Sequence, residues 1–76
     1  MRLADGFEEA LIGYGTQFTT EVAVYSLQTC VSILIDRDGM TSEEAMEFMS
    51  FNVLGAYVGK DTPIFIDSDM LEQENA

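Results

Sequence analysis

Residues 41–59 read Thr-Ser-Glu-Glu-Ala-Met-Glu-Phe-Met-Ser-Phe-Asn-Val-Leu-Gly-Ala-Tyr-Val-Gly, and this stretch decides the fold. Thr41 can cap a first helical turn while Glu44 reaches back to the Thr41 backbone, which satisfies two otherwise unpaired N–H groups. The glutamates of this stretch all lie in the first two turns, where the positive end of the helix dipole favours negative charge. The pattern predicts one helix over residues 41–58.

This helix would carry apolar residues on two faces. At 100° per residue, a wide face of the kind that packs on a core is formed by Ala45, Met46, Met49, Val53, Ala56 and Tyr57. A second, narrower stripe at i, i+3 and i+7 consists of Phe51, Leu54 and Val58. Two stripes need two surfaces to cover them, and a small domain offers only one. We therefore expect the second stripe to be the interface of a homo-oligomer.

Two strands and a first helix are predicted ahead of this segment. Residues 10–18 alternate with the period of two that is typical of a strand, and residues 22–25 are β-branched and aromatic. Because the connection between them is short, the two runs are expected to form a hairpin. Ser26 is a suitable N-cap for the amphipathic helix that follows, and Gly39 is suited to end it.

A third strand is expected at residues 64–66, where Pro63 at the strand entry suits an edge position. The predicted order is β-β-α-α-β. We expect a small α+β domain with two helices on one face of a three-stranded antiparallel sheet. The compact domain is expected to cover residues 1–71, and residues 72–76 are expected to form a frayed acidic tail.

The charge of the chain restricts its partners. Three basic residues stand against 14 acidic ones, so the formal net charge at pH 7 is −11. A field of this sign repels nucleic acid and anionic lipid, so direct binding to either is not expected. The candidates for contact with a basic partner protein are Asp36, Asp38, Glu43, Glu44 and Glu47, with carboxylates in place of phosphates. The alternative is that the charge serves solubility alone.

The sequence holds few of the residue types that metal binding needs. It has no histidine, which excludes the usual zinc sites and the histidine-based triads. Residues 36–39, Asp-Arg-Asp-Gly, resemble the middle of a calcium loop, but positions one and twelve of that loop fall on Leu34 and Ala45, which cannot bind a cation. The single cysteine, Cys30, lies on the apolar face of the first helix and is predicted to be a buried, unreactive thiol. We expect no metal and no cofactor.

A small-ligand site or an enzyme is the weaker alternative. Such a site would have to use Tyr14, Tyr25, Asn52 and Asp5 around a pocket, and a chain this short leaves little volume for one. We therefore do not expect an enzyme. No apolar run approaches the roughly 18 residues of a membrane span, and no signal-peptide pattern is present. The expected compartment is a reducing cytoplasm.

Three segments carry a more specific pattern. They are residues 5–10 (Asp-Gly-Phe-Glu-Glu-Ala), residues 38–41 (Asp-Gly-Met-Thr), and residues 51–63, which contain Asn-x-x-Gly-Ala-Tyr-Val-Gly-x-x-Thr-Pro. Together they resemble a group of small uncharacterised proteins from tailed bacteriophages. The resemblance implies a small protein that is made in the host cytoplasm during infection and acts by binding a host or viral protein. It implies no catalytic residue.

Overall fold

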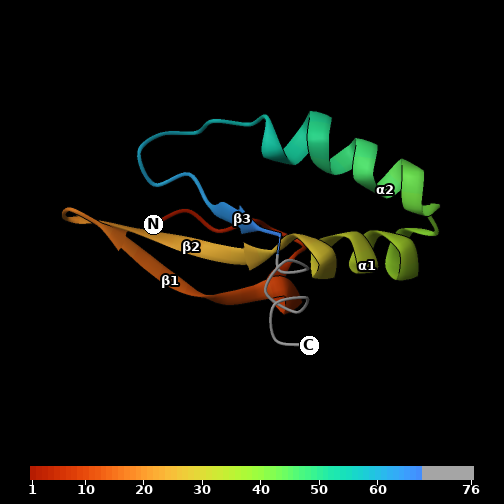
Figure 1. The fold of residues 1–76 in the computed structure, drawn as a ribbon, viewed down its shortest axis with the longest axis horizontal. Helices are drawn as coiled ribbons and strands as arrows, with labels where there is room; N and C mark the ends of the chain where they lie inside the picture. The colour runs from red at the N-terminus through yellow and green to blue at the C-terminus, as the bar shows by residue number, and fades with distance from the viewer. Residues whose placement is uncertain (68–76) are drawn as a thin grey trace.

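The structure is a computed structural model, and it describes residues 1–67 of the chain. Its elements follow the predicted order β-β-α-α-β after a short 3-10 turn, η1 (Figure 1). The bounds are η1 Glu8–Ala10, β1 Leu11–Gln17, β2 Thr20–Ser26, α1 Leu27–Asp38, α2 Ser42–Phe48, η2 Met49–Leu54 and β3 Ile64–Ile66. The predicted α+β class is confirmed. The predicted domain end at residue 71 and the acidic tail over residues 72–76 lie outside the described residues.

The sheet is mixed, whereas the sequence predicted an antiparallel one. β1 and β2 form the predicted antiparallel hairpin, and β3 pairs with the other side of β2 in parallel, with Val24 opposite Ile64. The reason is the path of the chain in Figure 1, where α1 continues beyond the end of β2 and α2 returns alongside α1. The chain thus comes back toward the start of β2 and enters β3 opposite Val24 (Figure 1), so that both strands run in the same direction.

The core lies between the sheet and the helices, and its buried members are Phe7, Ala10, Ala23, Tyr25, Cys30, Leu34, Ala45 and Met49. Tyr25 connects three parts of the chain. Its ring stacks on Phe65 of β3 with 5.4 Å between ring centroids, and its hydroxyl oxygen accepts a hydrogen bond of 2.7 Å from the Ala4 N–H. The residues ahead of η1 are thereby fixed against the sheet.

α1 begins and ends where the sequence predicts. The Ser26 hydroxyl oxygen accepts a hydrogen bond from the Thr29 N–H at 3.2 Å, so Ser26 is the N-cap. Gly39 follows the last residue with a φ of 70°, the left-handed conformation that glycine adopts at little cost. Both local signals are confirmed.

The second helix begins as predicted but ends early. Thr41 and Glu44 form the reciprocal capping box, yet α-helical geometry stops at Phe48 and continues as the wider π turns of η2 only to Leu54. The predicted end at Val58 is wrong. Ala56 is exposed and Tyr57 is 76% exposed, so neither packs in the predicted core face, and Met46 is 44% exposed.

The π turns have a packing reason. Ala45 and Met49 are fully buried and Val53 packs against the core, so the core contacts recur every four residues. An α-helix rotates such a series by about 40° at each step, because it has 3.6 residues per turn. The wider π turn reverses that rotation, so Val53 stays on the line of Ala45 and Met49.

Candidate functional site

The five predicted partner-binding carboxylates are all exposed and lie where the end of α1 adjoins α2. Two of them already have contacts. Asp38 accepts two hydrogen bonds of 3.0 Å from the Arg37 guanidinium, which lowers the pKa of the Asp38 carboxyl. Glu44 accepts the Thr41 N–H at 2.9 Å in the capping box. The other three make no hydrogen bond or ion pair within residues 1–67; they are Asp36, Glu43 and Glu47.

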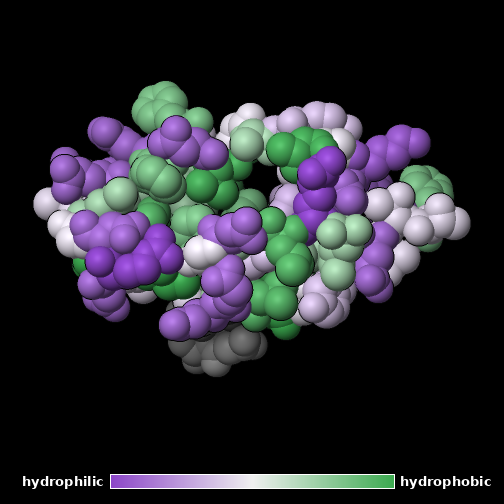
Figure 2. Space-filling model, turned by 180° about the vertical axis from the view of Figure 1, so that it is seen from behind, coloured by the Kyte–Doolittle hydropathy of each residue, from purple (hydrophilic) through white to green (hydrophobic). Residues whose placement is uncertain are grey.

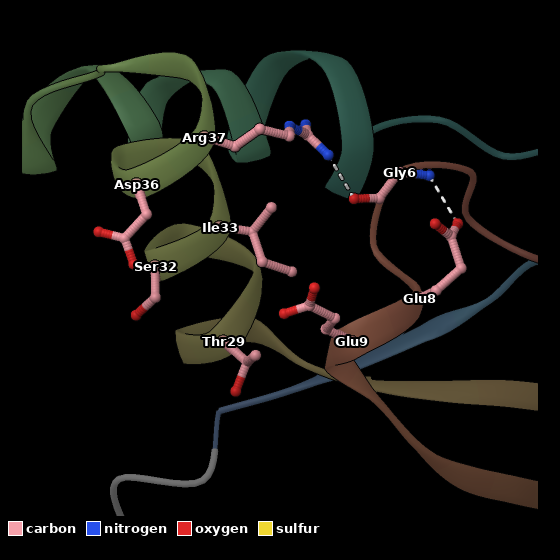
Figure 3. A pocket seen from close by; sticks show the side chains of 8 residues that line it. All are labelled: Gly6, Glu8, Glu9, Thr29, Ser32, Ile33, Asp36 and Arg37. Atoms are coloured by element: carbon pink, nitrogen blue, oxygen red, sulfur yellow. Dashed lines mark hydrogen bonds between the residues drawn. The ribbon is translucent and has the colours of Figure 1, made fainter.

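Arg37 fastens the segment before η1 to α1, as Figure 3 shows. Its Nη1 donates a hydrogen bond of 2.6 Å to the Gly6 carbonyl oxygen. The guanidinium carbon also lies 5.9 Å from the centre of the Phe7 ring, within the range of a cation–π contact. With Asp38 as a further partner, this cation has a structural role and is not available for an anionic ligand.

Beside Arg37 the molecule is hollowed over about 410 Å³, between the N-terminal loop and α1 (Figure 3). The residues that line this hollow are Gly6, Glu8, Glu9, Thr29, Ser32, Ile33, Asp36 and Arg37. Glu8 accepts the Gly6 N–H at 2.7 Å, while Glu9 and Asp36 are exposed. Within residues 1–67 no carboxylate is buried. The acids that line this hollow are therefore exposed to solvent.

The predicted apolar stripe is exposed, but it is not one stripe. Phe51 is 80%, Leu54 44% and Val58 46% exposed. Because the helix ends at Leu54, Val58 belongs to the following loop, where its N–H donates to the Thr62 hydroxyl oxygen at 2.9 Å. Phe51 and Val58 line two different hollows. The expected i, i+3, i+7 surface is thus corrected, since Phe51 and Leu54 lie in η2 and Val58 lies in the loop that follows.

The four residues considered for a small-ligand site do not converge. Only Asp5 and Asn52 line a common hollow, which has a volume of about 210 Å³ and mostly apolar walls. Tyr25 is buried in the core, and Tyr14 is 57% exposed on β1. Neither tyrosine therefore forms part of the wall of this hollow.

Cys30 is fully buried, as expected, and desolvation raises the pKa of its thiol to about 11. A thiol that is protonated at neutral pH is a poor nucleophile. In the part of the chain that the structure describes, no three acidic or thiol groups gather closely enough to hold a metal ion. Across the same residues no helix is long and apolar enough to span a bilayer.

Sequence reasoning missed two contributions to these surfaces. The first is Arg37, whose contacts with Gly6 and Phe7 join positions about 30 residues apart, so no local pattern marks them. The second is the pair Met40 and Phe48, which lie with Glu44 and Glu47 around Phe51. The i, i+3, i+4 spacing from Glu44 to Phe48 was visible in the sequence. Figure 2 shows one face of the molecule, on which hydrophilic and hydrophobic side chains lie next to one another over the helical end.

Comparison with protein-family profiles, with curated protein sequences and with solved structures finds no significant match to this chain. The surfaces above are therefore interpreted from their own geometry and charge.

Proposed function

We propose that this chain is a small acidic protein that binds another protein at a basic surface and masks that surface from nucleic acid. The observation that carries the proposal is the group Asp36, Glu43 and Glu47, whose exposed carboxylates have no partner within residues 1–67. Carboxylates accept hydrogen bonds from arginine and lysine as phosphate oxygens do. These acids, one on the last turn of α1 and two on α2, are therefore available to a partner.

The setting we propose is the cytoplasm of a bacterial host infected by a tailed bacteriophage, as the resemblance implies. A host enzyme that binds nucleic acid presents arginine and lysine side chains, and a chain with a net charge of −11 is attracted to such a surface at long range. The role proposed is binding rather than catalysis, without a cofactor.

The test is competition with duplex DNA for the partner that the intact protein recovers from host cells. We expect duplex DNA to displace the protein and added salt to weaken the complex steeply, since both compete for the same cations. The double substitution Glu43→Gln with Glu47→Gln removes two charges and keeps helix propensity. We expect it to weaken binding about tenfold, the equivalent of ~1.4 kcal/mol.

The matched control is Glu9→Gln with Glu21→Gln, which removes the same charge from exposed positions away from α2. We expect this control to change affinity much less than the α2 pair. If salt and the α2 substitutions both leave affinity unchanged, the acidic surface serves solubility and the proposal fails.

A second candidate function is a homo-oligomer with a structural or regulatory role and no charge mimicry. The observation that favours it is the exposure of Phe51 and Leu54, at 80% and 44%, both within η2. Leu54→Lys would place a charge in such an interface while leaving the core contacts of Met49 in place. Light scattering decides the matter, since a wild-type monomer at micromolar concentration contradicts this function.

A further inference from the structure

A hollow of about 280 Å³ lies along one side of α2 and η2. Its walls are Met40, Glu44, Glu47, Phe48, Phe51 and Asn52, and we call it the Phe51 hollow. From Glu44 onward these residues follow at i, i+3, i+4, i+7 and i+8, so they share one helix side. The hollow places an exposed aromatic ring beside two carboxylates. The sequence had predicted that the ring and the carboxylates belong to two separate surfaces.

The two carboxylates differ in how they are held. Glu44 Oε1 accepts the Thr41 N–H at 2.9 Å, while the Thr41 hydroxyl oxygen accepts the Glu44 N–H at 3.2 Å. This capping box holds the Glu44 side chain in place before any partner arrives, so less side-chain freedom is lost on binding. Glu47, one turn later, is exposed and makes no hydrogen bond or ion pair within residues 1–67.

The remaining walls suit a long side chain with an apolar stem and a cationic head. Phe51 is 80% exposed, so its ring face is accessible to a cation. Met40 and Phe48 are half-buried and offer apolar surface to a methylene chain. Asn52 adds an amide, whose oxygen accepts hydrogen bonds.

We propose that the Phe51 hollow receives an arginine side chain of the basic partner, an inference that rests on the proposed function and adds the chemistry of the contact. A planar guanidinium can stack on an aromatic ring and bind a carboxylate through two N–H groups, whereas the lysine ammonium is compact and strongly hydrated. An arginine that binds single-stranded nucleic acid uses the same two kinds of contact, with a base and with a phosphate. The hollow thus imitates a nucleotide rather than a phosphate alone.

A second copy of this chain is a poor occupant for the hollow. The chain has two arginines, and both already take part in ion pairs, Arg2 with Asp61 at 3.3 Å and Arg37 with Asp38 at 3.0 Å. Each copy also brings a net charge of −11, which opposes close approach of the acidic ends. Charge complementarity therefore favours a different, basic protein.

The test uses the intact protein and two fluorescein-labelled peptides of equal length and charge, one of repeated Arg-Gly and one of repeated Lys-Gly. Fluorescence anisotropy at low salt gives both affinities. We expect the arginine peptide to bind about two- to fivefold more tightly, the size of a cation–π contribution at an exposed site. Phe51→Leu, which keeps the apolar bulk and removes the ring, should reduce that preference to the part that the carboxylates confer and leave the lysine affinity unchanged.

The matched control is Tyr57→Leu, which removes another exposed ring, 76% exposed, from outside the hollow. The preference for arginine should survive in this variant. Equal affinities for the two peptides, or a preference as large in Phe51→Leu as in the wild type, would overturn the inference while leaving binding to a basic protein intact. Failure of both peptides to bind also overturns it, and the DNA competition then decides the proposed function separately. A concentration-dependent dimer that Phe51→Leu dissociates would assign the hollow to a second copy and reject the arginine contact.

Discussion

α1 and the α2–η2 segment begin alike and end differently. Each starts at a side-chain hydroxyl N-cap, Ser26 in one and Thr41 in the other. α1 keeps α-helical geometry for 12 residues, whereas α2 keeps it for 7 residues before the π turns begin. α1 buries two positions four residues apart, while the second segment places three such positions against the core. The start of a helix is thus decided locally, and its continuation is decided by the surface on which it packs.

The largest expected difference in stability is between two leucine substitutions, one in each segment. Leu34 of α1 is 1% exposed and Leu54 of η2 is 44% exposed. Leu34→Ala should lower the free energy of unfolding by about 3 kcal/mol, because it removes buried methyl groups and leaves a cavity. Leu54→Ala should change it by less than ~1 kcal/mol. Urea unfolding followed by circular dichroism compares the two, and similar losses would mean that Leu54 is covered in solution.

The glycines that follow the two segments should respond with opposite signs. Gly39 has a φ of 70° and open space where an alanine methyl group would lie, so Gly39→Ala should cost about 1–2 kcal/mol of purely conformational strain. Gly55 has a φ of −85°, and an added Cβ would lie 3.4 Å from the Ser50 carbonyl oxygen. Gly55→Ala should therefore stabilise by about 0.4–1 kcal/mol, because alanine restricts the unfolded chain. Thermal unfolding measures the stability of both variants. If Gly55→Ala lowers stability as much as Gly39→Ala does, the proposed difference between the two glycine conformations is wrong.

The two N-caps give a smaller contrast. Thr41→Ala and Ser26→Ala should each cost about 1 kcal/mol, because each leaves a backbone N–H without its partner. The Thr41 substitution should cost slightly more, since Glu44 loses the cap geometry that it shares with Thr41. Urea unfolding of both variants, with Ser42→Ala as the neighbouring control outside the cap, tests this order. A larger loss at Ser26 would show that the capping box adds nothing here.

The smallest effect is a dependence on pH at the end of α1. Hydrogen bonding to Arg37 lowers the pKa of Asp38 below its unfolded value of about 3.9. The stabilisation from this pair is therefore fully present above pH ~4 and is lost as the pH falls through the folded pKa. Asp38→Asn should be slightly less stable than wild type at pH 7, and this difference should shrink as the pH falls below ~4. Melting curves over this pH range, with Asp36→Asn as control, decide this, and a difference that does not shrink would rule out the ionic origin.

Much of the fold could be predicted because its signals are local. Ser26, Gly39 and Thr41 act on the backbone within four residues of themselves, and the strand at residues 64–66 is bounded by Pro63. The direction of β3 could not be predicted in this way, because it depends on how far α1 and α2 carry the chain before it returns. The end of the second helix also escaped prediction, since Val53 had to stay on the line of core contacts.

The features of the candidate surfaces also divide into those set by local sequence and those set by contacts between distant residues. The exposure of the acidic residues and of Phe51 follows from the helical pattern. The role of Arg37 depends on Gly6, which lies 31 residues earlier in the chain. The Phe51 hollow depends on where Met40 lies after the turn between the helices. Contacts between residues so far apart in sequence are set by the packing, which no local pattern specifies.

The parallel pairing of β2 with β3 also orders the folding of the chain in time. The hairpin and α1 are made of neighbouring segments and can form as soon as they leave the ribosome, because local contacts form fastest. Tyr25 stays without its stacking partner until Phe65 has been synthesised, after both helices. The nascent chain therefore carries an incompletely covered strand edge through most of its synthesis, a period in which such edges are prone to pair wrongly. With its net charge of −11, the chain repels other nascent copies during that interval, so the same acidity that we assign to partner binding also protects folding.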